Sequence, residues 1–165
     1  MTCPKSVRTA AIVSQAFIIV WTLLSLLASI FQNSFAGFYA SRHYIENTDK
    51  IVPVVTIISC FKGLLLSAAN VLMCRGKNVY APLIMTAVTM GIFPVITAAA
   101  STVRFNYYST TLGSAAFMKC SAVNNVESML SNILGTAAII TVAAAAVYAY
   151  AKNRTAEKTE AVFTE

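Results

Sequence analysis

Hydrophobic residues are gathered into four long stretches of this chain, and the segments between them and at the two ends carry nearly all of the charged side chains. An α-helix rises 1.5 Å per residue, so about 20 apolar residues cross the roughly 30 Å hydrocarbon core of a bilayer. Each of the four stretches is long enough to do so. The sequence therefore predicts an all-α fold, an integral membrane four-helix bundle, with transmembrane helices over residues 9–31, 51–74, 80–103 and 126–150.

The composition agrees with this class of protein. Of the 165 residues 58% are apolar and only 11% are charged, and the mean hydropathy is +0.70. A soluble domain has about 25% charged residues, and a soluble bundle needs a polar stripe along each helix. The polar residues inside the four stretches are Ser, Thr, Asn and Gln, which cross lipid when they face another helix. We expect one membrane domain over residues 1–165, without a separate soluble domain.

The basic residues are distributed unevenly, and this asymmetry predicts the topology. The first eight residues, the short segment between the second and third stretches, and the C-terminal tail contain seven of them: Lys5, Arg8, Arg75, Lys77, Lys152, Arg154 and Lys158. The two longer segments, 32–50 and 104–125, contain four: Arg42, Lys50, Arg104 and Lys119. The positive-inside rule then places both termini in the cytoplasm and makes the two longer segments outer loops. The tail 151–165 is short and polar, so we expect it to be disordered.

The net charge of +6 follows from the same residues. Because they lie next to the ends of the apolar stretches, we interpret them as orientation signals and lipid-headgroup contacts. A nucleic acid is not an expected partner.

Small and polar residues recur at helical spacing and predict packing surfaces. In the first stretch a seam at alternating spacings of four and three consists of Ala11, Gln15, Ile18, Thr22, Ser25 and Ser29. In the fourth stretch a helix-packing ridge at spacings of four consists of Ala137, Thr141, Ala145 and Ala149. Tyr148 and Tyr150 follow, and we expect them at the cytoplasmic interface.

One ionisable side chain stands at the centre of an apolar stretch. Lys62 costs about 2.5–3.5 kcal/mol at mid-membrane on insertion scales, and no carboxylate lies at matching depth. Ser59 and Asn70 lie near Lys62 on a helical wheel. In the third stretch Pro94 leaves the carbonyl of Met90 without its helical hydrogen bond, at a depth within about 3 Å of Lys62. We therefore expect a kink at Pro94 and a contact between the Lys62 ammonium and the Met90 carbonyl.

Two interpretations of Lys62 remain open. Together with Ser59, Asn70, Met90 and Pro94 it could form a contact site for a partner protein or for an anion. Alternatively, carbonyls and hydroxyls satisfy the lysine, or desolvation leaves it neutral, and it has a structural role only.

Motifs for catalysis are missing from the sequence. The single histidine, His43, lies in a predicted outer loop, and the four cysteines include no Cys-x-x-Cys pair. There is no phosphate-binding loop, no nucleophile elbow and no zinc signature. We therefore expect no enzyme activity, no cofactor and no metal site.

The function that the sequence favours is that of a non-enzymatic multi-pass membrane protein acting by helix and loop contacts, as an accessory, scaffold or assembly subunit. The alternative is a small oligomeric transporter or channel with an anion-selective path near Lys62. Expected partners are the lipid bilayer and another membrane protein or further copies of the chain. A bacterial cytoplasmic membrane and a eukaryotic membrane fit the sequence equally well.

Overall fold

The computed structural model describes residues 3–39, 42–76, 78–111 and 121–163. It gives the surroundings of side chains for residues 3–28, 57–76, 78–96, 98–99, 125–126 and 128–156. In the described part the protein is all-helical, with four helices. They are α1 (Lys5–Tyr39), α2 (Arg42–Arg75), α3 (Tyr80–Thr111) and α5 (Ser121–Phe163).

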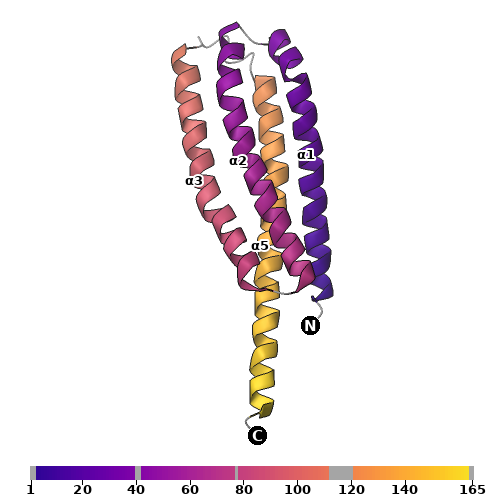
Figure 1. The fold of residues 1–165 in the computed structure, drawn as a ribbon. Helices are drawn as coiled ribbons and strands as arrows, with labels where there is room; N and C mark the ends of the chain where they lie inside the picture. Colours follow the sequence, from indigo (N-terminus) through magenta and orange to yellow (C-terminus); the bar gives the residue numbers. More distant parts are fainter. Residues whose placement is uncertain (1–2, 40–41, 77, 112–120, 164–165) are drawn as a thin grey trace.

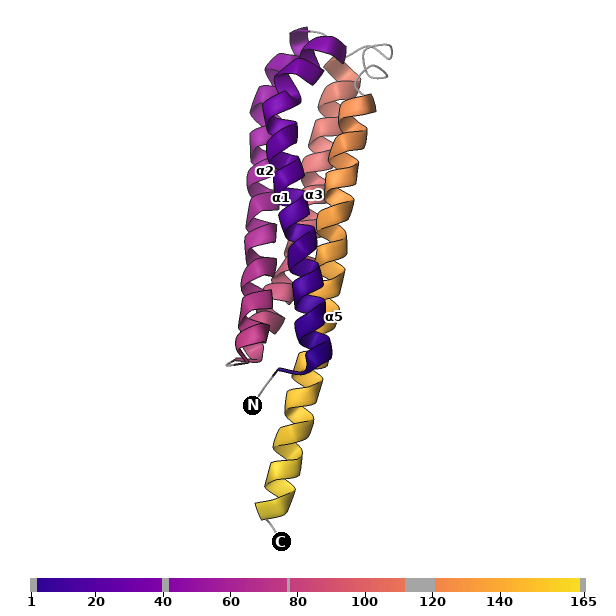
Figure 2. The ribbon, with the colours of Figure 1, turned by 90° about the vertical axis from the view of Figure 1, so that its right-hand side faces the viewer.

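The four helices lie side by side in one bundle (Figure 1). Helix α1 packs on α2 and α5, and α3 also packs on α2 and α5, with the most extensive interface between α1 and α5. Figure 2 shows the same arrangement from the side and makes clear that the last part of α5 projects beyond the other three helices. Both chain termini lie at this end of the bundle, which is also the end with the α2–α3 turn.

Three of the helices are long and apolar enough to cross a membrane. The segments concerned are Lys5–Ala28 in α1, Ile57–Arg75 in α2 and Ser128–Ala156 in α5. In α3 a shorter apolar segment runs over Tyr80–Ile96. The predicted apolar stretches thus coincide with four helices, and three of these meet the length and composition of a membrane span.

The helices extend further than the predicted spans, so most of each predicted outer loop is helical. Helix α1 continues to Tyr39 and α2 already begins at Arg42, within the predicted loop 32–50. Helix α3 continues to Thr111 and α5 begins at Ser121, within the predicted loop 104–125. Hydropathy marks only the part of a helix that suits lipid, whereas helix propagation adds residues at little cost once the helix is nucleated.

The expectation of a disordered tail was wrong for most of its length. Helix α5 continues through the polar residues after Tyr150 to Phe163. This segment contains Ala, Glu, Lys and Arg, which are strong helix formers, and it has neither Gly nor Pro. It starts from an existing helix, so it does not bear the cost of nucleation.

A tight turn joins α2 to α3, close to the segment predicted from the sequence. Gly76 has a φ of 68°, and its N–H donates to the carbonyls of Leu72 at 3.1 Å and Met73 at 3.2 Å. A left-handed residue at this position caps the free carbonyls of the last helical turn and is usually glycine. Two residues later the Asn78 side-chain oxygen accepts the Tyr80 N–H at 2.9 Å and so caps the start of α3.

Helix α3 contains Pro94 in its interior. Proline removes one backbone hydrogen bond and its ring crowds the preceding turn. Figure 1 shows α3 bent partway along its length, in agreement with the predicted kink.

The face of α1 that packs in the bundle differs in part from the predicted seam. Ala11 and Ile18 are buried as expected, but the buried positions next to them are Ser14 and Trp21, while Thr22 is exposed. The ring of Trp21 lies against α2, where a Cβ on Gly63 would be 3.1 Å from Trp21 Cζ3. The glycine leaves room for the indole at the helix contact.

The small residues of α5 lie inside the chain's own bundle. Ala137, Thr141 and Ala145 are at most 1% exposed, and Ala149 is half-buried. Small side chains allow two helix backbones to approach closely. This explains why the most extensive helix interface is the one between α1 and α5.

Candidate functional site around Asn70 and Lys62

Three polar side chains from three different helices meet in the bundle interior. Ser14 of α1, Asn70 of α2 and Thr141 of α5 are 0%, 3% and 0% exposed. Ser14 Oγ and Thr141 Oγ1 are 2.6 Å apart. The Asn70 amide donates to Ser14 Oγ at 3.3 Å, and its oxygen accepts from Thr141 Oγ1 at 3.2 Å. We call these residues the Asn70 triad. It ties together the three helices that meet the criteria for a membrane span.

The Asn70 triad can form a closed ring of hydrogen bonds. Ser14 Oγ is also 3.0 Å from the Ala137 carbonyl, so three contacts compete for the two hydroxyl hydrogens of Ser14 and Thr141. If Ser14 donates to Thr141 and Thr141 donates to Asn70, every member of the triad is satisfied. The Ala137 carbonyl then still accepts the backbone N–H of Thr141 within the helix. This assignment is favoured because an unpaired polar group is costly where the dielectric is low.

Two half-buried side chains extend the triad towards the edge of the α1–α2 contact. The second hydrogen of the Asn70 amide points to Gln15 Oε1 at 3.4 Å, and Gln15 Nε2 donates to Ser67 Oγ at 3.1 Å. Both amide hydrogens of Asn70 are therefore engaged within the chain. No group of this network titrates near neutral pH, so the arrangement suits helix registration rather than proton transfer.

Sequence reasoning placed Asn70 beside Lys62 but did not find its partners. Ser14 was missed because the seam was drawn through the neighbouring Gln15, although Ser14 follows Ala11 at a helical spacing of three. Thr141 was found as a packing residue, and the structure adds the hydrogen bonds of its hydroxyl.

Lys62 lies on α2 about 12 Å along the helix from Asn70. It is half-buried and next to Gly63, the residue that packs on Trp21. Ser59, one turn away, is also half-buried. Among the described residues, none forms a hydrogen bond or ion pair with Lys62. Lys62, the charged member of the predicted site, thus has no partner for its charge among the described residues.

The predicted contact between Lys62 and the Met90 carbonyl stays a prediction. The structure contains no hydrogen bond between these two described residues. The Met90 side chain is 42% exposed, and Pro94 is exposed on the same helix. Both side chains therefore lie on the outer surface of α3.

No known protein family, curated protein or solved structure matches this chain.

Metal-ligand chemistry gains no support from the described residues. Within these ranges no three His, Cys, Asp or Glu side chains lie close enough together to hold an ion. His43 and Cys120, the residues with the most obvious chemistry in the predicted outer loops, lie outside the described side chains.

Proposed function

We propose that this chain is a four-span membrane protein with both termini in the cytoplasm, which acts without catalysis as an accessory, scaffold or assembly subunit. Three of its helices have the length and apolar character of membrane spans, and the 32-residue α3 runs alongside them. The start of α1, the α2–α3 turn and the polar end of α5 all lie at one end of the bundle and carry basic residues. The positive-inside rule supports a cytoplasmic position for this end.

The main support for a contact function comes from Lys62. It is half-buried in a candidate span and has no hydrogen-bond or ion-pair partner among the described residues. Its outward neighbours on α2 are apolar, since Ile57, Phe61 and Leu64 are 56%, 60% and 66% exposed. A charge beside such a surface is expensive in lipid, and a carboxylate on another membrane helix would satisfy it.

The alternative, an anion path near Lys62, has less support. A path needs donors that are free to exchange with an ion, as in the rings of polar groups that line channels. Asn70 was the strongest additional donor expected from the sequence, yet both of its amide hydrogens are used inside the bundle. Lys62 and Ser59 alone make a weaker case for a lined path.

The test is the composition of the native particle, extracted in mild detergent, with and without Lys62. Lys62→Leu removes the charge, and Phe61→Leu is the matched control because it changes the neighbouring exposed residue without altering charge. We expect a second polypeptide at fixed stoichiometry with the wild type and with Phe61→Leu, and its loss with Lys62→Leu. Lys62→Arg should retain it because the positive charge remains.

Two other results would contradict the proposal. A particle whose composition is the same with Lys62→Leu would show that the lysine does not hold a partner. A pure homo-oligomer whose anion flux in liposomes is lost with Lys62→Leu would instead establish the transport alternative.

A further inference from the structure

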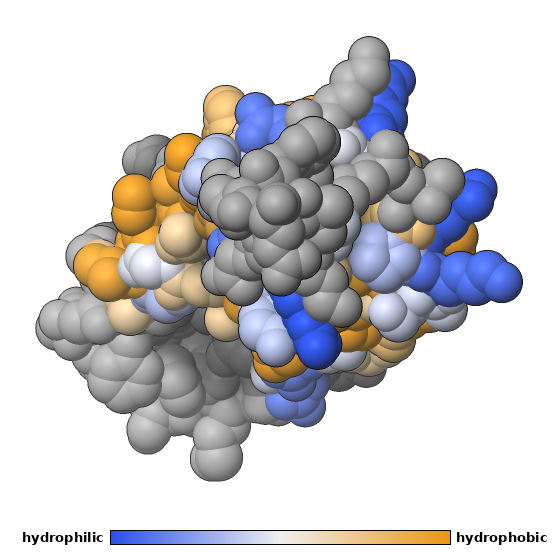
Figure 3. Space-filling view, turned by 90° about the horizontal axis from the view of Figure 1, so that it is seen from below, coloured by the Kyte–Doolittle hydropathy of each residue, from blue (hydrophilic) through white to orange (hydrophobic). Residues whose placement is uncertain are grey.

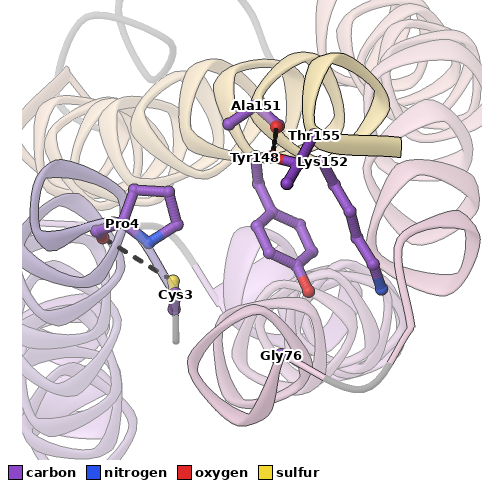
Figure 4. A pocket seen from close by; sticks show the side chains of 7 residues that line it. All are labelled: Cys3, Pro4, Gly76, Tyr148, Ala151, Lys152 and Thr155. Carbon is purple, nitrogen blue, oxygen red and sulfur yellow. Dashed lines mark hydrogen bonds between the residues drawn. The ribbon is translucent and has the colours of Figure 1, made fainter. Parts of the chain in front are cut away.

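A cavity of about 100 Å³ lies at the end of the bundle that carries both termini. Figure 4 shows that the two residues before α1, the α2–α3 turn and α5 all contribute to it. We call it the basal pocket; it is lined by Cys3, Pro4, Gly76, Tyr148, Ala151, Lys152 and Thr155. A single water needs only about 10–15 Å³ of such space, so the pocket has room for a group of several heavy atoms.

Tyr148 has an unsatisfied polar atom at this pocket. Its ring is packed in a core cluster with residues of α1 and α2 such as Val7 and Met73, and the residue is only 4% exposed. Its hydroxyl is buried and has no hydrogen-bond partner among the described residues. Figure 4 shows this hydroxyl pointing away from α5 towards the turn at Gly76. A buried phenol without a partner costs free energy, so an acceptor in the pocket would stabilise the protein.

The remaining polar groups of the pocket favour an anion as that acceptor. Lys152 brings a full positive charge and extends beside Tyr148 in Figure 4, without a hydrogen bond or ion pair to another described residue. Thr155 donates to the Ala151 carbonyl at 2.7 Å, and the Cys3 thiol faces the Pro4 carbonyl at 3.7 Å. None of the seven described lining residues is acidic.

Two helix ends add partial charges of opposite sign. The N-terminus of α1 contributes about half a positive charge, and the C-terminus of α2 about half a negative charge. These two contributions have opposite signs, and Lys152 is the charged side chain among the lining residues. Figure 3 views this end directly and shows hydrophilic side chains projecting around it, with hydrophobic side chains on the flanks of the bundle.

We propose that the basal pocket binds a phosphate group, with the Tyr148 hydroxyl as the hydrogen-bond donor and the Lys152 ammonium as the counter-charge. A phosphate oxygen accepts from a hydroxyl and pairs with an ammonium at the same time. The phosphate can belong to an anionic lipid headgroup at the membrane edge or to a soluble phosphate. Both sources present the same chemistry to the pocket, and the proposal does not depend on a partner at Lys62.

The experiment uses full-length protein in a neutral detergent, freed of bound lipid, with two probes. Inorganic phosphate is titrated while the thermal midpoint of unfolding is followed. Retention of phosphatidylglycerol against phosphatidylcholine is measured by native mass spectrometry. The variants are Tyr148→Phe, which removes only the hydroxyl, and Lys152→Gln. Arg154→Gln is the matched control because Arg154 is exposed, lies two positions from Lys152 and does not line the pocket.

We expect Tyr148→Phe and Lys152→Gln each to weaken binding of the effective probe by about tenfold or more, since each contributes a charge-assisted contact. Arg154→Gln should change it by less than about twofold, as is usual for exposed charges. If Tyr148→Phe weakens binding of phosphatidylglycerol but inorganic phosphate does not bind, the pocket is a site for a lipid headgroup. If Tyr148→Phe also weakens binding of inorganic phosphate, the pocket accepts soluble phosphate too.

The proposal is overturned if Tyr148→Phe binds both probes as tightly as the wild type. It is also overturned if Arg154→Gln weakens binding as much as Lys152→Gln, because binding would then reflect only the general positive charge of this end. Should Tyr148→Phe fail to fold, the comparison between the Lys152 and Arg154 variants decides the question alone.

Discussion

The hydrogen count in the Asn70 triad leads to an unequal pair of mutational effects. Thr141→Val removes a hydroxyl with little change of shape. Asn70 Oδ1, buried and 3.2 Å from that hydroxyl, then loses its donor, while Ser14 turns to the Ala137 carbonyl at 3.0 Å. An unsatisfied buried acceptor costs about 1–3 kcal/mol. We expect Thr141→Val to destabilise the protein by that amount.

Ser14→Ala should cost less although Ser14 takes part in more contacts. After this change Thr141 still donates to Asn70 Oδ1, and the Asn70 amide still donates to Gln15 at 3.4 Å. Thr141 Oγ1 loses its donor and the Asn70 amide loses one of its two acceptors, but each of these atoms keeps one hydrogen bond and Asn70 Oδ1 keeps its donor. Hydrogen bonds between membrane helices average only about 0.6 kcal/mol. The expected cost is therefore below about 1 kcal/mol.

The assay is reversible unfolding in mixed detergent and dodecyl sulfate, followed by circular dichroism and by the fluorescence of Trp21, the only tryptophan of the chain. Thr136→Val is the matched control, because this threonine is exposed on α5 and donates only within its own helix, to the Asn132 carbonyl at 2.9 Å. It should change stability by less than about 0.5 kcal/mol. Equal costs for Thr141→Val and Ser14→Ala, or a larger cost for Ser14→Ala, would refute the hydrogen-bonded ring.

Two further predictions concern the α1–α2 contact and the basal pocket. Gly63→Ala should be about 1–3 kcal/mol less stable than Gly135→Ala, because its new methyl would meet Trp21 at 3.1 Å while nothing lies within 4 Å of the methyl at Gly135. The same unfolding assay checks this, and equal stabilities would show that the indole moves aside freely. Burial raises the pKa of the Cys3 thiol, and the charge of the nearby Cys74 adds to the effect while that of Arg8 opposes it. Its contribution to stability is therefore complete below the pKa of the unfolded thiol and is lost as the pH rises through the raised value. A variant with Cys3 as the only cysteine loses the contribution of Cys74 but keeps that of burial, the larger cause. Its pH midpoint of alkylation should be higher in folded than in unfolded protein; a midpoint at or below the unfolded one would contradict this.

Much of the architecture was visible in the sequence because it depends on local properties. Apolar stretches of sufficient length predicted the four helices, and the glycine and asparagine of the α2–α3 segment lie where a helix has to end and the next begin. Pro94 predicted the bend of α3 because proline acts on the turn that precedes it. The helices continue beyond the predicted membrane spans, since hydropathy measures compatibility with lipid and not helical propensity.

The candidate sites depended on information that is not local. Ser14, Asn70 and Thr141 are far apart in the sequence, and each stands in a segment where several polar residues could have faced a neighbour. Tyr148 was expected at the membrane interface, although it continues the helix face of Thr141 and Ala145 at spacings of seven and three. The structure places it in the core, with its hydroxyl at the basal pocket.

The sequence by itself determined that this chain forms long apolar helices and where the turn between α2 and α3 lies. It also determined that Lys62 is the ionisable group well inside an apolar stretch. Only the tertiary structure decided which face of each helix turns inward, and hence that Trp21 packs on Gly63 and that Asn70 is enclosed. The physical reason is that an apolar helix suits lipid on every side, so its rotation is set by the shape and hydrogen bonds of its neighbours rather than by hydropathy.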